Sequence, residues 1–433
     1  MKTRAKTMSI VSLMTIVILL FFVGGRSEEA KSDTLIIKGG TIYSITHGII
    51  YDGCILVKNG KIQKIGQNLF ASPEALVLEA KDKWIMPGFV VVHSSPFAMH
   101  RIVKEDMNPK IFNYLDPFSL GLRLCLATGI TTFSSDASPS PYFRPGGGRH
   151  KNYGFRNAIL KSYYGSLKDM YIKEPAFLYI DMAQLLPSEK EELRGFFQRA
   201  SEYIAQEAQY EKSKNIKEAN APVLTPDLKS YVAVLKRELP VRFNADKKKD
   251  ILKVLGFVDE FSVQAQILGA AEGWLLAEEI GWRNISTIIQ PEVFLRGDPY
   301  QHPSGGSNIK NAVLQKEKGI EFALLTTEPS IGLGGMIGND LLTFPLAGSF
   351  AVRGGLDEKD ALEALTIKPA KLLGISDRVG SLEEGKDADI IILDGNPLDY
   401  RTYVDYTIIN GKVLYDKSQS ALYKRILKPK RMF

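Results

Sequence analysis

His93 is the residue in this chain whose chemistry is best suited to metal binding, because a neutral imidazole is a common ligand for divalent cations. It follows an apolar run at residues 86–92, and two residues later Ser95 would project from the same side of a strand. A neutral hydroxyl is a weak donor for a zinc-like ion. A single histidine rarely holds a metal by itself, so these residues indicate at most a fragment of a metal site. The other histidines show no mutual ligand spacing: His47, His100, His150 and His302.

The composition predicts a large folded protein and disfavours nucleic-acid binding. Of the 433 residues, 45% are hydrophobic, enough for one large domain with a smaller companion. The formal net charge of +6 is concentrated near the chain ends, and the remainder is nearly neutral, which argues against a nucleic-acid-binding surface. The basic tail at residues 417–433 is expected to be a solvated end, with contact to anionic lipid as the alternative.

The N-terminus has the layout of a secretory signal. Lys2, Arg4 and Lys6 precede an uncharged, mostly apolar run at residues 8–23, followed by Gly24 and Gly25. We therefore expect residues 1–27 to be a signal peptide and the protein to be extracytoplasmic, either periplasmic or secreted. An uncleaved membrane anchor is the alternative. The two cysteines, Cys54 and Cys125, permit one disulfide but do not require it.

The order of predicted elements limits the fold to a few architectures. Both chain ends are β-rich, and each contains an Asn-Gly pair between apolar runs, a strong hairpin signal, at Asn59-Gly60 and Asn410-Gly411. In between, short apolar runs alternate with segments of helical spacing, which indicates parallel strands with crossover helices in an open sheet or a closed barrel. The predicted strands are 129–136, 158–164, 241–245, 264–270, 285–291 and 322–329, and the predicted helices are 250–261, 271–282 and 308–318.

A longer helix is expected at residues 188–218, where apolar residues including Phe196, Phe197 and Tyr203 share one face. The spacing favours a peripheral helix packed against the core. A partner-binding helix with an exposed aromatic stripe is the alternative.

Three segments together resemble the amidohydrolase superfamily, in particular its imidazolonepropionase-like and dihydroorotase-like relatives. They are residues 55–93, which contain Met86-Pro87-Gly88; residues 240–274, with Glu272-Gly273-Trp274; and residues 361–389, which end in Lys386-Asp387-Ala388-Asp389. The resemblance spans about residue 34 to about residue 416. It implies an α/β fold: a (β/α)8 TIM-like barrel at residues 88–376 and a small composite β-sandwich built from residues 34–87 and 377–416.

The resemblance also implies which residues would hold a metal. Members use one or two divalent metals at the carboxyl end of the barrel to activate water. Here, of the two alternating histidines on the first strand, only His93 is present. The expected ligand positions on the first, fifth, sixth and eighth strands are occupied by Ser95, Asn244, Gly269 and Thr327. All four are weaker donors than the family's histidines and aspartate, or no donors at all.

Two further residues resemble parts of a rebuilt site. Lys161 is similar to a strand lysine that some relatives carbamylate into a bridging metal ligand. Glu328 supplies a carboxylate one residue beyond the missing aspartate, and is the only catalytic candidate that the sequence offers.

These observations favour an exported amidohydrolase homologue that is metal-depleted and catalytically impaired, a pseudoenzyme that binds a small molecule or a partner. One alternative is an active hydrolase of carbon-nitrogen bonds outside peptides, acting on a cyclic amide-like substrate with zinc or another divalent metal at His93, Lys161 and Glu328. The other is a scaffold subunit, either a homo-oligomer or a heteromer with an intact paralogue.

Overall fold

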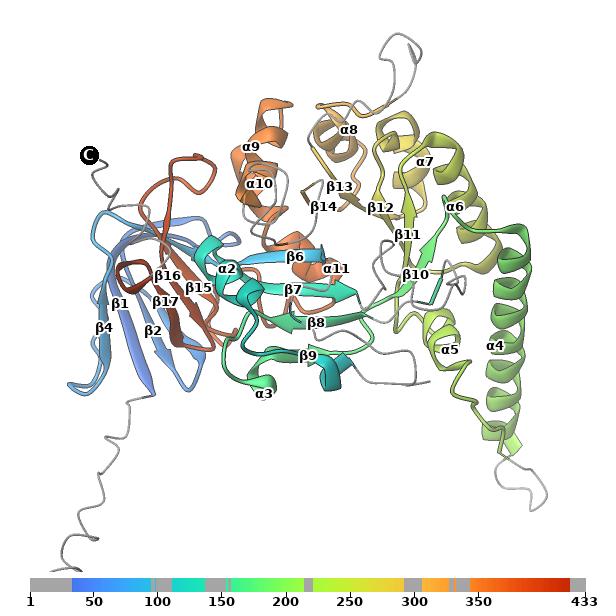
Figure 1. Cartoon of the computed structure of the whole chain (residues 1–433), viewed down its shortest axis with the longest axis horizontal. Helices are drawn as coiled ribbons and strands as arrows, with labels where there is room; N and C mark the ends of the chain where they lie inside the picture. Colours follow the sequence, from blue (N-terminus) through green and yellow to red (C-terminus); the bar gives the residue numbers. More distant parts are fainter. Residues whose placement is uncertain are drawn as a thin grey trace, which may run out of the picture.

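The computed structural model describes residues 33–94, 98, 111–136, 153–154, 157–213, 221–291, 306–326, 331 and 343–420. The predicted signal peptide and the tail from residue 421 onward lie outside these residues. Within them, no helix combines the length and the apolar character needed to cross a membrane. Strands from the two chain ends lie side by side, while the middle of the chain builds a second body (Figure 1).

The chain ends form one eight-stranded sheet in the order β17-β16-β15-β5-β1-β2-β3, with β4 paired in parallel to β1. Antiparallel pairing of β15 with β5 joins the two ends, since Ile390 is the partner of Pro87 and Leu393 that of Trp84. The predicted composite domain is therefore a single hydrogen-bonded sheet around an apolar core that both ends supply. Its strands are β1 (Thr34–Tyr43), β2 (Ile49–Lys58), β3 (Lys61–Gly66), β4 (Leu76–Glu79), β5 (Trp84–Pro87), β15 (Ile390–Leu393), β16 (Val404–Ile409) and β17 (Lys412–Asp416).

The two Asn-Gly turns of this sheet touch each other although about 350 residues separate them. Asn59 and Gly60 have φ angles of 51° and 76°, and Asn410 and Gly411 have φ angles of 49° and 71°, the positive values that two-residue hairpin turns require. A Cβ atom on Gly60 would lie 3.0 Å from the carbonyl oxygen of Asn410, and one on Gly411 would lie 3.1 Å from the Cα of Gly60. Glycine at both turns is what allows this close approach.

The first half of the barrel contains a reversed strand. β6 (Phe89–Ser94) and β7 (Ile130–Asp136) are parallel, but β8 (Asn157–Lys161) runs antiparallel to β7, and β9 (Tyr171–Lys173) runs antiparallel to β8. Residues just before β8 reach the other half of the barrel, because Gly154 N–H donates to the carbonyl of Tyr179 at 2.8 Å. The strand predicted at 158–164 is therefore present, but its direction differs from that of a regular barrel.

The second half is a regular parallel sheet in the order β10-β11-β12-β13-β14. Its strands are β10 (Leu178–Asp181), β11 (Val241–Ala245), β12 (Ala265–Gly269), β13 (Ser286–Ile289) and β14 (Phe322–Leu324). The sequence predicted four of these five strands and missed β10. In Figure 1 these strands stand steeply beside the nearly horizontal β6–β9.

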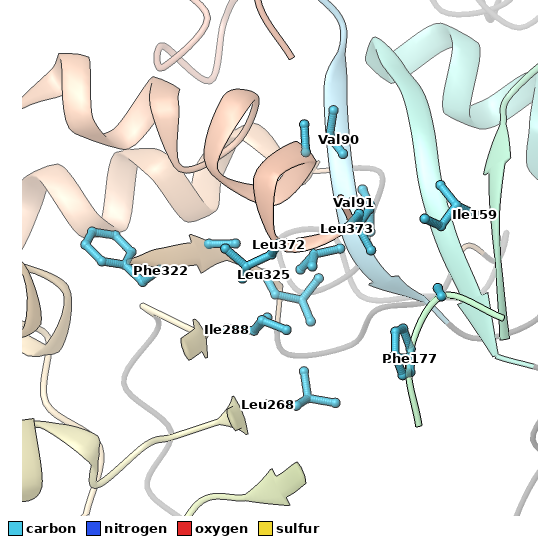
Figure 2. Packing of buried hydrophobic residues seen from close by; sticks show 14 of the residues in the cluster. Val90, Val91, Ile159, Phe177, Leu268, Ile288, Phe322, Leu325, Leu372 and Leu373 are labelled. Atoms are coloured by element: carbon cyan, nitrogen blue, oxygen red, sulfur yellow. The ribbon is translucent and has the colours of Figure 1, made fainter. Parts of the chain in front are cut away.

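The segment around Leu365 closes the barrel between β14 and β6. Val90 N–H donates to the carbonyl of Leu365 at 3.0 Å, and Leu324 N–H donates to that of Ala364 at 2.9 Å. The following helix, α11 (Ile367–Leu372), brings Leu372 and Leu373 among the barrel side chains. Figure 2 shows Leu373 together with Val91, Leu268 and Ile288 in the space that the strands enclose. Apolar packing therefore fills the deep part of the barrel.

Helices cover the outside of the barrel (Figure 1). The longest described helix, α4 (Pro187–Ser213), buries the aromatic face that the sequence left open for a partner. Phe197 is 1% exposed and contacts Phe257 and Phe261 of α6 (Lys248–Phe261). Phe196 stacks on Tyr231 of α5 (Lys229–Leu235), with ring centroids 4.8 Å apart. The prediction of a packed peripheral helix is confirmed, and no exposed aromatic stripe remains on this face.

The remaining described helices are short. They are η1 (Ile111–Tyr114), α2 (Leu120–Thr128), α3 (Leu167–Met170), α5 (Lys229–Leu235), α6 (Lys248–Phe261), η2 (Gly273–Leu276), α7 (Ala277–Trp282), α8 (Asn311–Glu317), α9 (Pro345–Arg353), α10 (Glu358–Glu363) and η4 (Lys417–Gln419). Cys54 in β2 and Cys125 in α2 are both buried free thiols, so the disulfide that the sequence permitted does not form.

Candidate functional site

The carboxyl ends of β6, β10 and β11 bring together the polar side chains of the candidate site, as expected for a parallel barrel. His93, near the end of β6, is half-buried, and its ring lies nearly parallel to that of Tyr179 in β10, with centroids 6.5 Å apart and planes 9° apart. Loss of hydration, together with the positive charge of Arg242, lowers the pKa of His93 to about 3. His93 is therefore a neutral imidazole at physiological pH.

Asp181 is a site residue that sequence reasoning missed. It is the last residue of β10, is registered with Asn244 of β11, and both side chains are half-buried. Burial raises the pKa of the Asp181 carboxyl, and a hydrogen bond with the Asn244 side chain opposes this shift. The alternation of Leu178-Tyr179-Ile180-Asp181 is a strand signal, but four residues are too few to stand out by periodicity.

Arg242 places a permanent positive charge deep in the barrel. It is fully buried and donates to the backbone carbonyl of Val92 at 2.6 Å and to Oε1 of Gln266 at 2.8 and 3.1 Å. Its guanidinium also lies 3.6 Å above the ring of Phe177. These bonds tie β6, β11 and β12 together beneath the site, and the charge opposes binding of a second cation beside it.

Gly269, at the predicted sixth-strand ligand position, has no room for a side chain. Its φ angle is +96°, and a Cβ atom built there would lie 2.1 Å from Oδ1 of Asp246. The Asp246 carboxylate therefore occupies the volume in which a histidine side chain would begin. At the fifth-strand position, Asn244 is in place at the end of β11, but it offers only an amide.

Lys161 lies at the opposite end of the barrel from His93, and this corrects the expectation that the two share a site. Lys161 pairs with Thr132 near the start of β7, whereas Ser94 pairs with Ser135 near its end. The reversal of β8 is the reason. The ammonium of Lys161 instead lies 2.7 Å from Oδ2 of Asp387 and 2.9 Å from Oδ1 of Asp389, an ion pair with the composite sheet.

Ser95, Thr327 and Glu328 lie outside the described residues, so their roles stay predictions. Among the residues that are described, no three histidine, cysteine, aspartate or glutamate side chains are grouped so that they could hold a metal ion. The donors that the described residues place at this barrel end are His93, the Asp181 carboxyl and the amide of Asn244. They do not fit the metal that the resemblance implies, because zinc sites use three or four strong ligands.

Comparison with known proteins shows similarity to amidohydrolases. The model of the amidohydrolase family matches residues 288–414. The chain is 25% identical to 5'-deoxyadenosine deaminase of Methanobrevibacter smithii over 92% of this chain and 97% of that protein. It is 29% identical to imidazolonepropionase of Thermoplasma acidophilum over 24% of this chain and 26% of that protein.

Solved structures agree on the fold. The crystal structure of an amidohydrolase from Thermotoga maritima aligns with a TM-score of 0.70 at 23% identity, covering 88% of this chain and all of that one. The family match, the relatives and this structural likeness agree with the barrel and its additional β-domain. Together these findings support the amidohydrolase superfamily and, at that level, a hydrolase acting on carbon-nitrogen bonds.

Proposed function

We propose that this chain is an exported amidohydrolase-family protein that has lost metal-dependent hydrolysis and uses its barrel to bind a small molecule. The observation that carries the proposal is the contact between Gly269 and Asp246. Because the Asp246 carboxylate lies 2.1 Å from the position of a Cβ on Gly269, the sixth-strand ligand is excluded by the packing as well as absent from the sequence.

Electrostatics support the same proposal. The neutral imidazole of His93 is a competent ligand, but Arg242 is close enough for its charge to lower the pKa of His93. A divalent cation held near His93 would meet this buried guanidinium, with Asn244 in place of a histidine to compensate. Export is supported by the N-terminal sequence pattern alone, and fractionation of cells into cytoplasmic and extracytoplasmic pools tests it.

Elemental analysis of the purified full chain tests the loss of metal. We expect desalted protein to contain far less than one zinc, iron, manganese or nickel atom per chain. The His93→Ala variant is the matched control, and its metal content should equal that of the wild type. One tightly bound metal per chain that disappears in His93→Ala would overturn the proposal.

One observation favours a second candidate, an active hydrolase of carbon-nitrogen bonds. The raised pKa of Asp181 brings this carboxyl closer to the range in which a side chain exchanges protons near neutral pH. If the protein hydrolyses a lactam, hydantoin or other cyclic amide, Asp181→Asn should reduce kcat by about a hundredfold or more. An unchanged kcat in that variant would exclude Asp181 as the proton-transfer group.

A further inference from the structure

The strand β4 (Leu76–Glu79) is an open edge of the composite sheet. It pairs in parallel with β1, and no other described strand pairs with its outer side. In Figure 1 it lies at the left margin of the sheet, on the side away from the barrel. Leu76 and Val77 are 52% and 45% exposed although both are apolar. Proteins usually protect a sheet edge with charged residues, proline or a covering segment, so this apolar edge indicates a docking surface.

The strand β3, at one end of the same sheet, shows the protection that β4 lacks. Ile62 N–H donates to the carbonyl of Lys386 at 3.0 Å, and Gly385 N–H donates to the carbonyl of Ile62 at 2.8 Å, so another segment of the chain covers part of this edge. β3 also carries Lys61 and Lys64. In β4, by contrast, only the last residue is charged. Of these two edges, β4 is the one suited to pairing with another strand.

The backbone hydrogen bonds of β4 show which of its groups are available. Ala80 N–H, directly after the strand, donates to a carbonyl of β1 at 2.7 Å. In a parallel ladder, alternate residues of a strand bond to the same neighbour, so the N–H and C=O groups of Leu76 and Leu78 point toward β1. Those of Val77 and Glu79 therefore point outward, where a further strand can pair with them.

A second copy of β4 fits this edge when the two strands run antiparallel about a two-fold axis at Val77. Val77 is then opposite Val77 of the other copy and exchanges both backbone hydrogen bonds with it, while Leu76 is opposite Leu78. Leu78 already packs against the apolar core of the composite sheet, so the new contacts between Leu76 and Leu78 extend that core across the edge. One strand supplies both sides of the contact, as an isologous dimer requires.

Charge selects this register among those that the outward backbone groups allow. With the axis at Glu79, two carboxylates would be directly opposite each other, which destabilises a strand pair. With the axis at Leu78, each Glu79 carboxylate would be opposite Val77. With the axis at Val77, Glu79 is opposite Ala75, and the two carboxylates are about 13 Å apart along the strand, farther than the screening length at physiological ionic strength.

We propose that this protein forms a homodimer in which β4 pairs antiparallel with β4 of a second copy, centred on Val77. The pairing joins the two composite sheets into one continuous sheet. It is independent of the proposed loss of metal, because β4 belongs to the composite sheet and contains no residue of the candidate site.

Sedimentation velocity of the purified full chain tests the proposal. We expect a species with twice the mass of the monomer. Val77→Lys places two like charges opposite each other at the axis and should weaken the dimer by about tenfold or more. Val223→Lys, at a residue that is 82% exposed and lies outside the composite sheet, is the matched control and should leave the dimer unchanged. Circular dichroism confirms that each variant is folded.

Two further experiments test the position of the axis. Because Val77 is opposite itself, a mixture of Val77→Lys and Val77→Glu should form a heterodimer at a concentration where neither variant dimerises by itself. Val77→Cys should form a disulfide-linked dimer on mild oxidation, since the Cα atoms of a hydrogen-bonded antiparallel pair lie about 5.5 Å apart, within the range that a disulfide spans. Val223→Cys is the control and should run as a monomer on non-reducing denaturing gels.

The dimer must be present in the wild type and must depend on Val77. A wild-type monomer would overturn the proposal, whether hydrogen exchange finds the Val77 amide protected by another segment of the chain or open to solvent. A dimer that persists in Val77→Lys, or that Val77→Cys does not link, uses another surface and would also overturn it. The elemental analysis that tests the loss of metal gives its answer separately from all of these results.

Discussion

The ammonium of Lys161 and the carboxylate of Asp387 form a buried ion pair, 2.7 Å long, between the barrel and the composite sheet. Asp389 and Asn410 accept the remaining two ammonium hydrogen bonds, so the three N–H donors of a lysine are all satisfied. Burial alone would raise the pKa of Asp387, but Lys161, assisted by Lys61 and Arg378, lowers it to about 2. At Asp389 the effect of burial is larger than that of the Lys161 charge, so the pKa of Asp389 is raised.

Removing Lys161 should therefore destabilise both bodies together. We expect Lys161→Met to lower the free energy of unfolding by about 3–5 kcal/mol, because it removes the counter-charge of the buried Asp389 carboxylate and one of the three that Asp387 has. Urea denaturation of the full chain measures this. The matched control is Lys236→Met, which breaks a surface pair with Glu207, whose side chains are 34% and 35% exposed, and should cost less than about 1 kcal/mol. Equal effects in the two variants would contradict the assigned role.

Substitution of Gly269 should lower the stability of the fold, and a second substitution at Asp246 should restore part of it. Gly269→Ala places a Cβ against Asp246 and forces a non-glycine residue to a φ angle of +96°, which should lower the free energy of unfolding by about 2–4 kcal/mol. Asp246→Gly in the same chain removes the clash but not the backbone strain. Thermal denaturation should show partial recovery in the double variant; additive losses would mean that the carboxylate does not fill this volume.

Acid should weaken the fold through His93. The pKa of His93 is about 6.5 in the unfolded chain and about 3 in the folded one. As the pH falls below about 6.5 the unfolded state gains a proton that the folded state does not, so the free energy of unfolding decreases until about pH 3. In His93→Gln this contribution is absent. Between pH 7.5 and 5.0 the wild type should lose about 1–2 kcal/mol more than His93→Gln. Parallel urea titrations at the two pH values measure this. Equal losses in the two proteins would mean that the pKa of His93 is not lowered in the folded state.

The buried aromatic face of α4 predicts a large loss on truncation. Phe197 is 1% exposed and contacts three other aromatic rings, so Phe197→Ala should cost about 3–5 kcal/mol. Trp282→Ala, at a residue that is 79% exposed, is the matched control and should cost less than about 1 kcal/mol. Equal losses of unfolding free energy in Phe197→Ala and Trp282→Ala would contradict the packing of this face against α5 and α6.

Local patterns in the sequence predicted most of the strands, because burial and turn chemistry are local properties. β11 was placed at residues 241–245, the bounds that the structure gives, since a buried parallel strand is a short apolar run between polar segments. The two hairpins were predicted equally directly, from their Asn-Gly pairs. By contrast, β10 is only four residues long, and its strand character depends on pairing with β11.

The direction of β8 and the position of Lys161 could not be predicted in the same way. Residues 157–161 have strand composition whether they run up or down the barrel, and direction depends on tertiary pairing with Thr132 and its neighbours. The weak ligand positions at Asn244 and Gly269 were visible in the sequence. The sequence did not show that Asp246 fills the space beside Gly269, because this contact depends on a φ angle of +96° at Gly269.

The pairing of β5 with β15 has a consequence for biosynthesis. About 300 residues separate the two strands, so the β5 edge that β15 covers stays open until the ribosome has made β15. Any product that terminates before about residue 390 lacks β15 and carries this uncovered edge, which can pair with other chains and can be recognised by proteases. Only a polypeptide that extends through β15 can cover the edge, so a prematurely terminated product is exposed to quality control at this strand.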